Sequence, residues 1–139
     1  LGASPLSKAE RLAVVDVARA ELLTPRGLRT LSPRHPGYRG AYRGGPDARN
    51  VAYHQGTVWP WLLGFYVEAR LLAEGRGARA KRDLAGLVSA FRRHLAEGCL
   101  GHVAEVFDGD PPHAAGGAYA QAWSTAELLR AEALLGVRR

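Results

Sequence analysis

Apolar residues recur at three- and four-residue steps in the part of this chain that follows residue 80. They are Leu84, Leu87, Val88, Phe91 and Leu95, and arginines occupy positions 82, 92 and 93. Such spacing places the apolar side chains on one face of an α-helix and the charged side chains on the other. The segment is therefore predicted to be an amphipathic helix with one face against a core and one face in water.

Two helices are predicted before this one. The sequence Ser-Lys-Ala-Glu at 7–10 matches a capping box and starts a helix that continues to about Leu23. It ends at the Thr-Pro-Arg-Gly sequence 24–27, because proline cannot continue the hydrogen-bond ladder and glycine tolerates a left-handed turn. The next helix is expected to start with Thr57 as its cap and to reach Glu74. It is apolar on nearly all sides, so we expect it to be buried between other helices.

Glycine and proline concentrate between the predicted helices. Residues 27–56 contain six of the 17 glycines and three of the eight prolines, which predicts a long loop. Residues 98–117 predict a second loop, and residues 120–135 predict a fourth helix. Four helices without a credible strand pair predict an all-α fold.

The composition is typical of a globular protein, with 47% apolar and 23% charged residues, and one domain is expected for 139 residues. No apolar run approaches the ~20 residues of a membrane-spanning helix, and the first residues lack the features of a signal peptide. We therefore expect a cytoplasmic protein without a membrane partner. The net charge of +6 favours nucleic acid only weakly, because the arginines are dispersed and form no Lys/Arg block.

Cysteine and histidine are too few and too scattered to predict a metal site. The five histidines form no i, i+4 pair, and the single cysteine, Cys99, has no second thiol with which to share a zinc ion. Cys99 is expected to be a small buried hydrophobe. The sequence also lacks a glycine-rich phosphate loop, so we expect neither a metal nor another cofactor.

Residues 53–61 combine hydrogen-bonding side chains with two tryptophans. The sequence is Tyr-His-Gln-Gly-Thr-Val-Trp-Pro-Trp, and it contains His54, Gln55, Trp59 and Trp61. Pyranose rings have apolar C–H faces that stack on indole rings and hydroxyls that need donors and acceptors, so this mixture favours a sugar site. The alternative is that both tryptophans are core residues and that His54 is an interior hydrogen-bonding group. This segment alone does not decide between the two.

A second group of polar and aromatic side chains follows residue 101. It comprises His102, Glu105, Asp108, Asp110, His113, Gln121 and Trp123. Glycoside hydrolysis uses two carboxyl groups, and this segment can supply one of them. The Asp-Gly-Asp-Pro sequence at 108–111 is typical of a turn, whereas Glu105 has apolar neighbours that favour an inward position. Glu105 is therefore the better catalytic candidate.

Four stretches of the sequence form a series of motifs: residues 22–33, 53–61, 105–113 and 120–124. In this order they resemble the C-terminal part of the bacterial and archaeal glycogen debranching enzymes, the amylo-α-1,6-glucosidase family. The resemblance implies an (α/α)6 toroid of the glucoamylase-like type, of which about four helices would be present here. It also implies inverting hydrolysis, without a metal, of α-1,6-linked glucose at the branch stubs of a glycogen-like glucan or limit dextrin.

The resemblance further implies roles for individual residues, with Glu105 as the general base. Residues of the non-reducing glucose subsite are His54, Gln55 and Trp59, and those of the wall around the base are Asp108, Gln121 and Trp123. Residues 115–119 depart from the Arg-Gly-Cys pattern common in the family, which leaves the shape of this loop open. The general acid of the family belongs to an upstream aspartate motif that these 139 residues lack, so the chain alone is expected to be inactive.

The sequence contains no methionine, which predicts a fragment or a cleaved chain. Residues 1–139 are then the C-terminal portion of a glucosidase domain, completed by the remaining helices of that domain in the same or another chain. Two other functions stay open: a non-catalytic glucan-binding fragment or module, and a basic nucleic-acid binder. Salt separates these classes, because phosphate contacts weaken steeply as salt rises and contacts to a neutral sugar do not.

Overall fold

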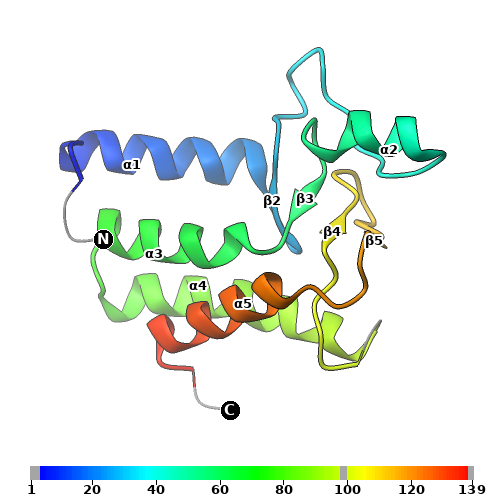
Figure 1. Cartoon of the computed structure of the whole chain (residues 1–139). Helices are drawn as coiled ribbons and strands as arrows, with labels where there is room; N and C mark the ends of the chain where they lie inside the picture. The colour runs from blue at the N-terminus through cyan, green and yellow to red at the C-terminus, as the bar shows by residue number, and fades with distance from the viewer. Residues whose placement is uncertain (1–3, 98–99, 138–139) are drawn as a thin grey trace.

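The computed structural model describes residues 4–97 and 100–137, so the expectation for Cys99 lies outside the described residues. Within them the chain is mostly helical, with five α-helices and a small antiparallel sheet. The helices are α1 (Lys8–Val17), α2 (Pro46–Tyr53), α3 (Leu62–Glu74), α4 (Ala78–Arg92) and α5 (Ala122–Leu135). The helices α1, α3, α4 and α5 lie side by side, and the sheet lies with α2 at one end of this helical layer (Figure 1). No helix among these residues is long and apolar enough to cross a membrane.

Three predicted helices are confirmed close to their expected bounds. The capping box of α1 is present, since the Glu10 amide donates to Ser7 Oγ at 3.3 Å and the Ser7 amide donates to Glu10 Oε2 at 2.7 Å. A π-helical turn, Ala18–Leu22, continues α1 to its predicted end. The helix α4 buries its predicted apolar face and continues as a 3-10 turn, Arg93–Ala96. The helix α5 begins two residues after its expected start.

The prediction of an all-α chain with about four helices is wrong in two respects. The segment predicted as a long loop contains α2, whose first turn holds Pro46, a position where proline leaves no helical hydrogen bond unmade. Five short strands also form: β1 (Leu23–Thr24), β2 (Gly27–Arg29), β3 (Val58–Trp59), β4 (Val106–Phe107) and β5 (Ala115–Gly116). Strands of two or three residues are too short to show the alternation of apolar and polar residues that predicts a strand.

The predicted start of the second helix is also wrong, because α3 begins at Leu62 and not at Thr57. Residues 58–59 form β3, which pairs with β2 on one side and with β4 on the other. This pairing satisfies backbone groups that the first turn of a helix would leave without partners. Thr57 is buried, and its hydroxyl donates to the Ala52 carbonyl at 2.8 Å instead of capping a helix.

The helix α3 packs against α1, α4 and α5 but is covered on only part of its surface. Its buried apolar residues include Leu63, Val67 and Leu71, which belong to the hydrophobic core. Phe65 is 46% exposed and Leu72 is 41% exposed, so the expected burial on all sides is not met within the described residues. Two large apolar side chains two turns apart on α3 are therefore open to solvent.

Candidate functional site

The sheet brings the two candidate segments together. Its strand order is β1-β2-β3-β4-β5, with every neighbouring pair antiparallel. Val58 of β3 lies opposite Phe107 of β4, so residues 53–61 and 105–108 meet where β3 and β4 run side by side (Figure 1). Backbone pairing between distant parts of the chain thus builds the site.

The carboxylate of Glu105 is held at both oxygens. Glu105 is half-buried and comes directly before β4. Its Oε1 accepts a hydrogen bond from the Tyr53 hydroxyl, and its Oε2 accepts one from the Ala118 amide at 2.8 Å. The Glu105 amide also donates to the Ala118 carbonyl at 2.8 Å. Charge-assisted hydrogen bonds at both oxygens fix the orientation of this side chain.

Residues 115–119, which depart from the family pattern, contain Ala118, whose main chain holds Glu105. Gly117 has a φ of +69°, a conformation that glycine adopts without strain, and a Cβ there would lie only 3.0 Å from Glu105 Cβ. A Cβ on Gly116 would lie 3.0 Å from the ring of Tyr42. The two glycines let the 115–119 turn approach Glu105 closely, so the loop shape left open by the sequence follows from their lack of side chains.

Tyr53 is a site residue that the sequence prediction did not include. Its ring contacts three other rings, with centroid distances of 4.7 Å to Trp59, 4.8 Å to His54 and 5.7 Å to Tyr42. Burial raises the pKa of the Tyr53 phenol far above its ordinary value, and the hydrogen bond to the Glu105 carboxylate raises this pKa further. The phenol therefore stays protonated at neutral pH and remains a donor to Glu105.

Beside Tyr53 lies a small hollow of about 110 Å³ with aromatic walls. Its lining residues are Thr30, His54, Trp59, Trp61, Leu62 and Trp123. Trp59 is 6% exposed and its Nε1 donates to the Tyr53 carbonyl at 3.0 Å, so this tryptophan is buried as the core alternative required. Its ring still faces the parallel ring of His54, with 5.8 Å between centroids, and His54 is exposed. Within the described residues His54 is therefore accessible to solvent, and its role in sugar binding stays a prediction.

The remaining sugar-site candidates lie at the edges of this region and are held through their main chains. Gln55 is exposed, and its carbonyl accepts from the Arg39 amide at 2.5 Å. Gln121 immediately precedes α5 with extended backbone angles, and its amide donates to the Val103 carbonyl at 2.8 Å. Trp123, in the first turn of α5, is 49% exposed and lies 6.2 Å from Trp59, ring centre to ring centre.

The two aspartates of the predicted turn both hold a neighbouring loop. Asp108 is 4% exposed. Its Oδ1 accepts from the Tyr42 amide at 2.7 Å, and its Oδ2 accepts from Arg43 Nε at 2.9 Å and from Arg43 Nη2 at 2.5 Å. Asp110 is exposed and accepts from the Tyr38 hydroxyl at 2.9 Å. The Asp108 contacts fix Tyr42 against Tyr53, so Asp108 supports Glu105 indirectly.

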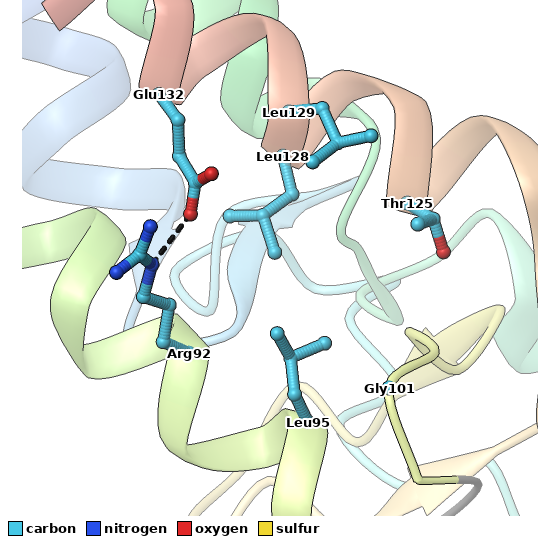
Figure 2. Close-up of a pocket in the computed structure, with 7 residues that line it drawn as sticks. All are labelled: Arg92, Leu95, Gly101, Thr125, Leu128, Leu129 and Glu132. Carbon is cyan, nitrogen blue, oxygen red and sulfur yellow. Dashed lines mark hydrogen bonds and ion pairs between the residues drawn. The ribbon is translucent and has the colours of Figure 1, made fainter. Parts of the chain in front are cut away.

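A larger cavity than this hollow lies elsewhere and contains none of the predicted site residues. It measures about 590 Å³ and is lined by Arg92, Leu95, Gly101, Thr125, Leu128, Leu129 and Glu132. Figure 2 shows the Arg92–Glu132 ion pair on one side of this cavity, with Leu95 from the 3-10 turn after α4 and Leu128 from α5 near it. The two charged groups of the pair lie 2.6 Å apart. The cavity has no aromatic wall, unlike the hollow beside Tyr53. Among the described residues, no group of three or more His, Cys, Asp or Glu side chains is arranged to hold a metal ion.

A buried histidine supports the backbone next to Glu105. His94 is 3% exposed, with its ring 4.7 Å from that of Phe107 between centroids. The Ala104 amide donates to His94 Nε2 at 3.4 Å, and His94 Nδ1 lies 3.3 Å from the Glu97 carboxylate, which also pairs with Arg26. Burial lowers the pKa of His94, the nearby Arg26 charge lowers it further, and Glu97 opposes both effects.

Acidification is therefore expected to destabilise the chain through His94. A lowered folded-state pKa means that the unfolded chain binds the proton first, as pH falls below the ordinary histidine pKa of about 6.5. The contribution of neutral His94 to the free energy of unfolding is complete above about pH 6.5, and it is lost as the pH falls through the folded-state pKa of His94. Urea unfolding of the wild-type chain and of His94→Gln measures the free energy of unfolding of each. The difference in favour of the wild type should become smaller at acidic pH. An advantage that stays constant from about pH 7 to 5 would contradict this.

The chain is thus mostly helical, and its small sheet holds a restrained carboxylate, Glu105, whose hydrogen-bond partner Tyr53 contacts two residues that line the aromatic hollow. The chain belongs to the amylo-alpha-1,6-glucosidase family, because the sequence model of that family matches residues 1–130. A curated relative, the glycogen debranching enzyme of Saccharomyces cerevisiae, is 38% identical over 61 residues, which cover 40% of this chain. The matched part is 4% of the yeast protein's length. The family resemblance seen in the motifs is thereby confirmed.

Proposed function

We propose that this chain forms the base side of an inverting α-1,6-glucosidase site for branch linkages in glycogen-like glucans such as limit dextrin. The observation that carries the proposal is the Glu105 carboxylate, which is held by Tyr53 and Ala118 and is joined through the Tyr53 ring to Trp59 and His54 in the wall of the hollow. Carboxylate and aromatic walls are the two features that a glycosidase subsite combines. Membership of the family supports the same reading.

In this mechanism Glu105 removes a proton from the attacking water. The water oxygen bonds to the anomeric carbon on the face opposite the leaving oxygen, the glycosidic C–O bond breaks, and an acid protonates the leaving oxygen. A single displacement of this kind inverts the anomeric configuration. The acid comes from outside these 139 residues, where the family resemblance places its aspartate motif.

The neighbouring residues bind and orient the terminal glucose. The exposed ring of His54 packs against the apolar face of the sugar, the buried Trp59 supports that ring from behind as part of the wall of the hollow, and Gln55 and Gln121 reach the sugar hydroxyls. Trp123 and the loop fixed by Asp108 close the wall around Glu105. Tyr53 keeps the carboxylate pointing in one direction, which gives the base a defined geometry toward the water.

We further propose that residues 1–139 are the C-terminal portion of an (α/α)6 toroid. Exposed aliphatic side chains support this, because Val14 and Val17 on α1 and Leu72 on α3 are each at least 41% exposed. Val14 and Val17 lie on neighbouring turns of α1, which is the placement expected of side chains that another element of the domain covers. The remaining helices of the domain, in the same or another chain, are the partner that fits.

The isolated chain is expected to release no glucose from limit dextrin above background, although it binds glucan. Without general acid assistance the leaving oxygen departs unaided, and such assistance is typically worth ~10²–10⁴ in rate. Glucose release by the purified chain and by the complete protein that carries it should be compared in one assay. Glucose release by the chain alone would contradict the proposal that the general base lies in this chain and the general acid lies outside it.

A second candidate is a non-catalytic glucan-binding fragment. The hollow beside Tyr53 favours it, because three tryptophans line it and stacking of a sugar on indole rings needs no general acid. The two proposals differ in one measurement: the complete protein releases glucose in the first case and only binds glucan in the second.

A further inference from the structure

Tyr42 lies on a loop, residues 38–43, that is anchored to both segments of the candidate site. The loop forms backbone hydrogen bonds with Gln55 and with Asp110. The Tyr42 amide also donates to the buried Asp108 carboxylate at 2.7 Å. The backbone of Tyr42 is therefore fixed by contacts that do not involve the proposed base.

The Tyr42 ring contacts both groups that hold the Glu105 carboxylate. The first group is Tyr53, whose hydroxyl donates to Glu105 and whose ring centre lies 5.7 Å from that of Tyr42. The second is the 115–119 turn, where the Ala118 amide donates to Glu105 at 2.8 Å. A Cβ on Gly116 would lie 3.0 Å from the Tyr42 ring, so the backbone of this turn packs directly on the ring. We call Tyr53 and the 115–119 turn the two supports of Glu105, and the Tyr42 ring is in contact with both.

We propose that Tyr42 is a positioning residue for the general base and that it acts through the two supports. The inference rests on the function proposed above and adds the side chain that keeps the supports in register with each other. Loss of the ring leaves space beside both supports at once, so the phenol of Tyr53 and the Ala118 amide can move apart and Glu105 can move with them. A base must lie within hydrogen-bonding reach of the water whose proton it takes, and a displacement of about 1 Å can cost as much as ~10² in rate.

The ring of Tyr42, and not its hydroxyl, carries this role. Within the described residues the Tyr42 hydroxyl has no hydrogen-bond partner, whereas the ring makes the contacts with Tyr53 and Gly116. Tyr42→Phe removes the hydroxyl and keeps these contacts, and Tyr42→Leu removes the ring while it keeps an apolar side chain. The two variants therefore separate the part of the side chain that positions the base from the part that does not.

The first test is kcat on limit dextrin, measured in the complete protein that carries this chain. Tyr42→Leu should lower kcat about tenfold and change KM by less than about twofold, because the base is displaced while the hollow keeps its walls. Tyr42→Phe should have a kcat within about twofold of the wild type. Tyr38→Leu is the matched control, since it removes a ring from the same loop that packs on Gly56 and not on a support of Glu105, and it should retain kcat.

The second test distinguishes positioning of the base from a general loss of structure. Glu105→Gln has no base to position, so adding Tyr42→Leu to it should leave the remaining kcat unchanged. If Tyr42→Leu does not fold, Gly116→Ala takes its place in both tests, because the added Cβ pushes on the Tyr42 ring from the side of the turn.

Three outcomes overturn the proposal. They are a wild-type kcat in Tyr42→Leu, a Tyr42→Phe variant as slow as Tyr42→Leu, and an equal loss of kcat from Tyr42→Leu with and without Glu105. The proposed function fails separately, if Glu105→Gln itself retains kcat. A loss of kcat in Glu105→Gln together with normal turnover in Tyr42→Leu overturns only the positioning role.

Discussion

Glu105→Gln is expected to lower kcat of the complete protein on limit dextrin by ~10² or more, with substrate binding largely retained. The amide keeps the size of the carboxylate and can still accept the hydrogen bond from Tyr53. It cannot take a proton from water, so only the chemical step loses its base. Initial rates over a range of limit dextrin concentrations separate kcat from KM and measure this directly.

Asp108→Asn and Asp110→Asn are the controls for this experiment. Both aspartates hold the loop that contains Tyr38 and Tyr42, and their contacts are made with that loop and not with Glu105. We expect these variants to change KM or stability and to retain most of kcat. Near-normal turnover in Glu105→Gln together with lost turnover in an aspartate variant would show that the base is a different carboxylate.

The second large effect is expected for replacement of Asp108, and it concerns the free energy of unfolding. Asp108 is 4% exposed and accepts three hydrogen bonds, one from the Tyr42 amide and two from the Arg43 guanidinium. Asp108→Ala leaves the half-buried Tyr42 amide without its acceptor and releases the arginine. Hydrogen bonds to charged groups contribute about 1.5–3 kcal/mol, so the free energy of unfolding should fall by an amount in this range. Urea unfolding of the chain at neutral pH measures the change.

Asp110→Ala is the matched comparison, because Asp110 lies on the same turn and is exposed. Its hydrogen bond with the Tyr38 hydroxyl is partly accessible to water, so its removal should lower the free energy of unfolding by less than about 1 kcal/mol. Equal losses in the two variants would contradict the role given to the buried carboxylate.

The long helices were predictable because their signals are local and repeated. The apolar face of α4 recurs over several turns, and the capping box of α1 lies within four consecutive residues. The helix α2 and the five strands were missed for the opposite reason. A helix of eight residues and strands of two or three residues carry too few positions for a periodic pattern, and they are stabilised by pairing with distant segments.

The site was predictable in its two segments but not in their contacts. Motifs identified Glu105, His54 and Trp59, whereas the roles given to them stay predictions. The hydrogen bond from Tyr53 depends on the β3–β4 pairing, and the ion pair of Arg43 with Asp108 joins residues 65 positions apart. No local pattern reports a contact over such a separation. The signal that could have identified Tyr53 was its position as the first residue of the 53–61 segment, directly before His54.

The anomeric configuration of the first glucose released from limit dextrin tests the central claim most directly. A base that activates water for a single displacement at an α-linked glucose gives the β-anomer first, because attack occurs on the face opposite the leaving oxygen. Proton NMR in the first minutes of the reaction, before mutarotation mixes the anomers, distinguishes the two products. The proposed function predicts β-glucose from the complete protein, and no glucose from its Glu105→Gln variant. α-Glucose as the first product would contradict it, since retention requires a covalent intermediate and a nucleophile in place of the base.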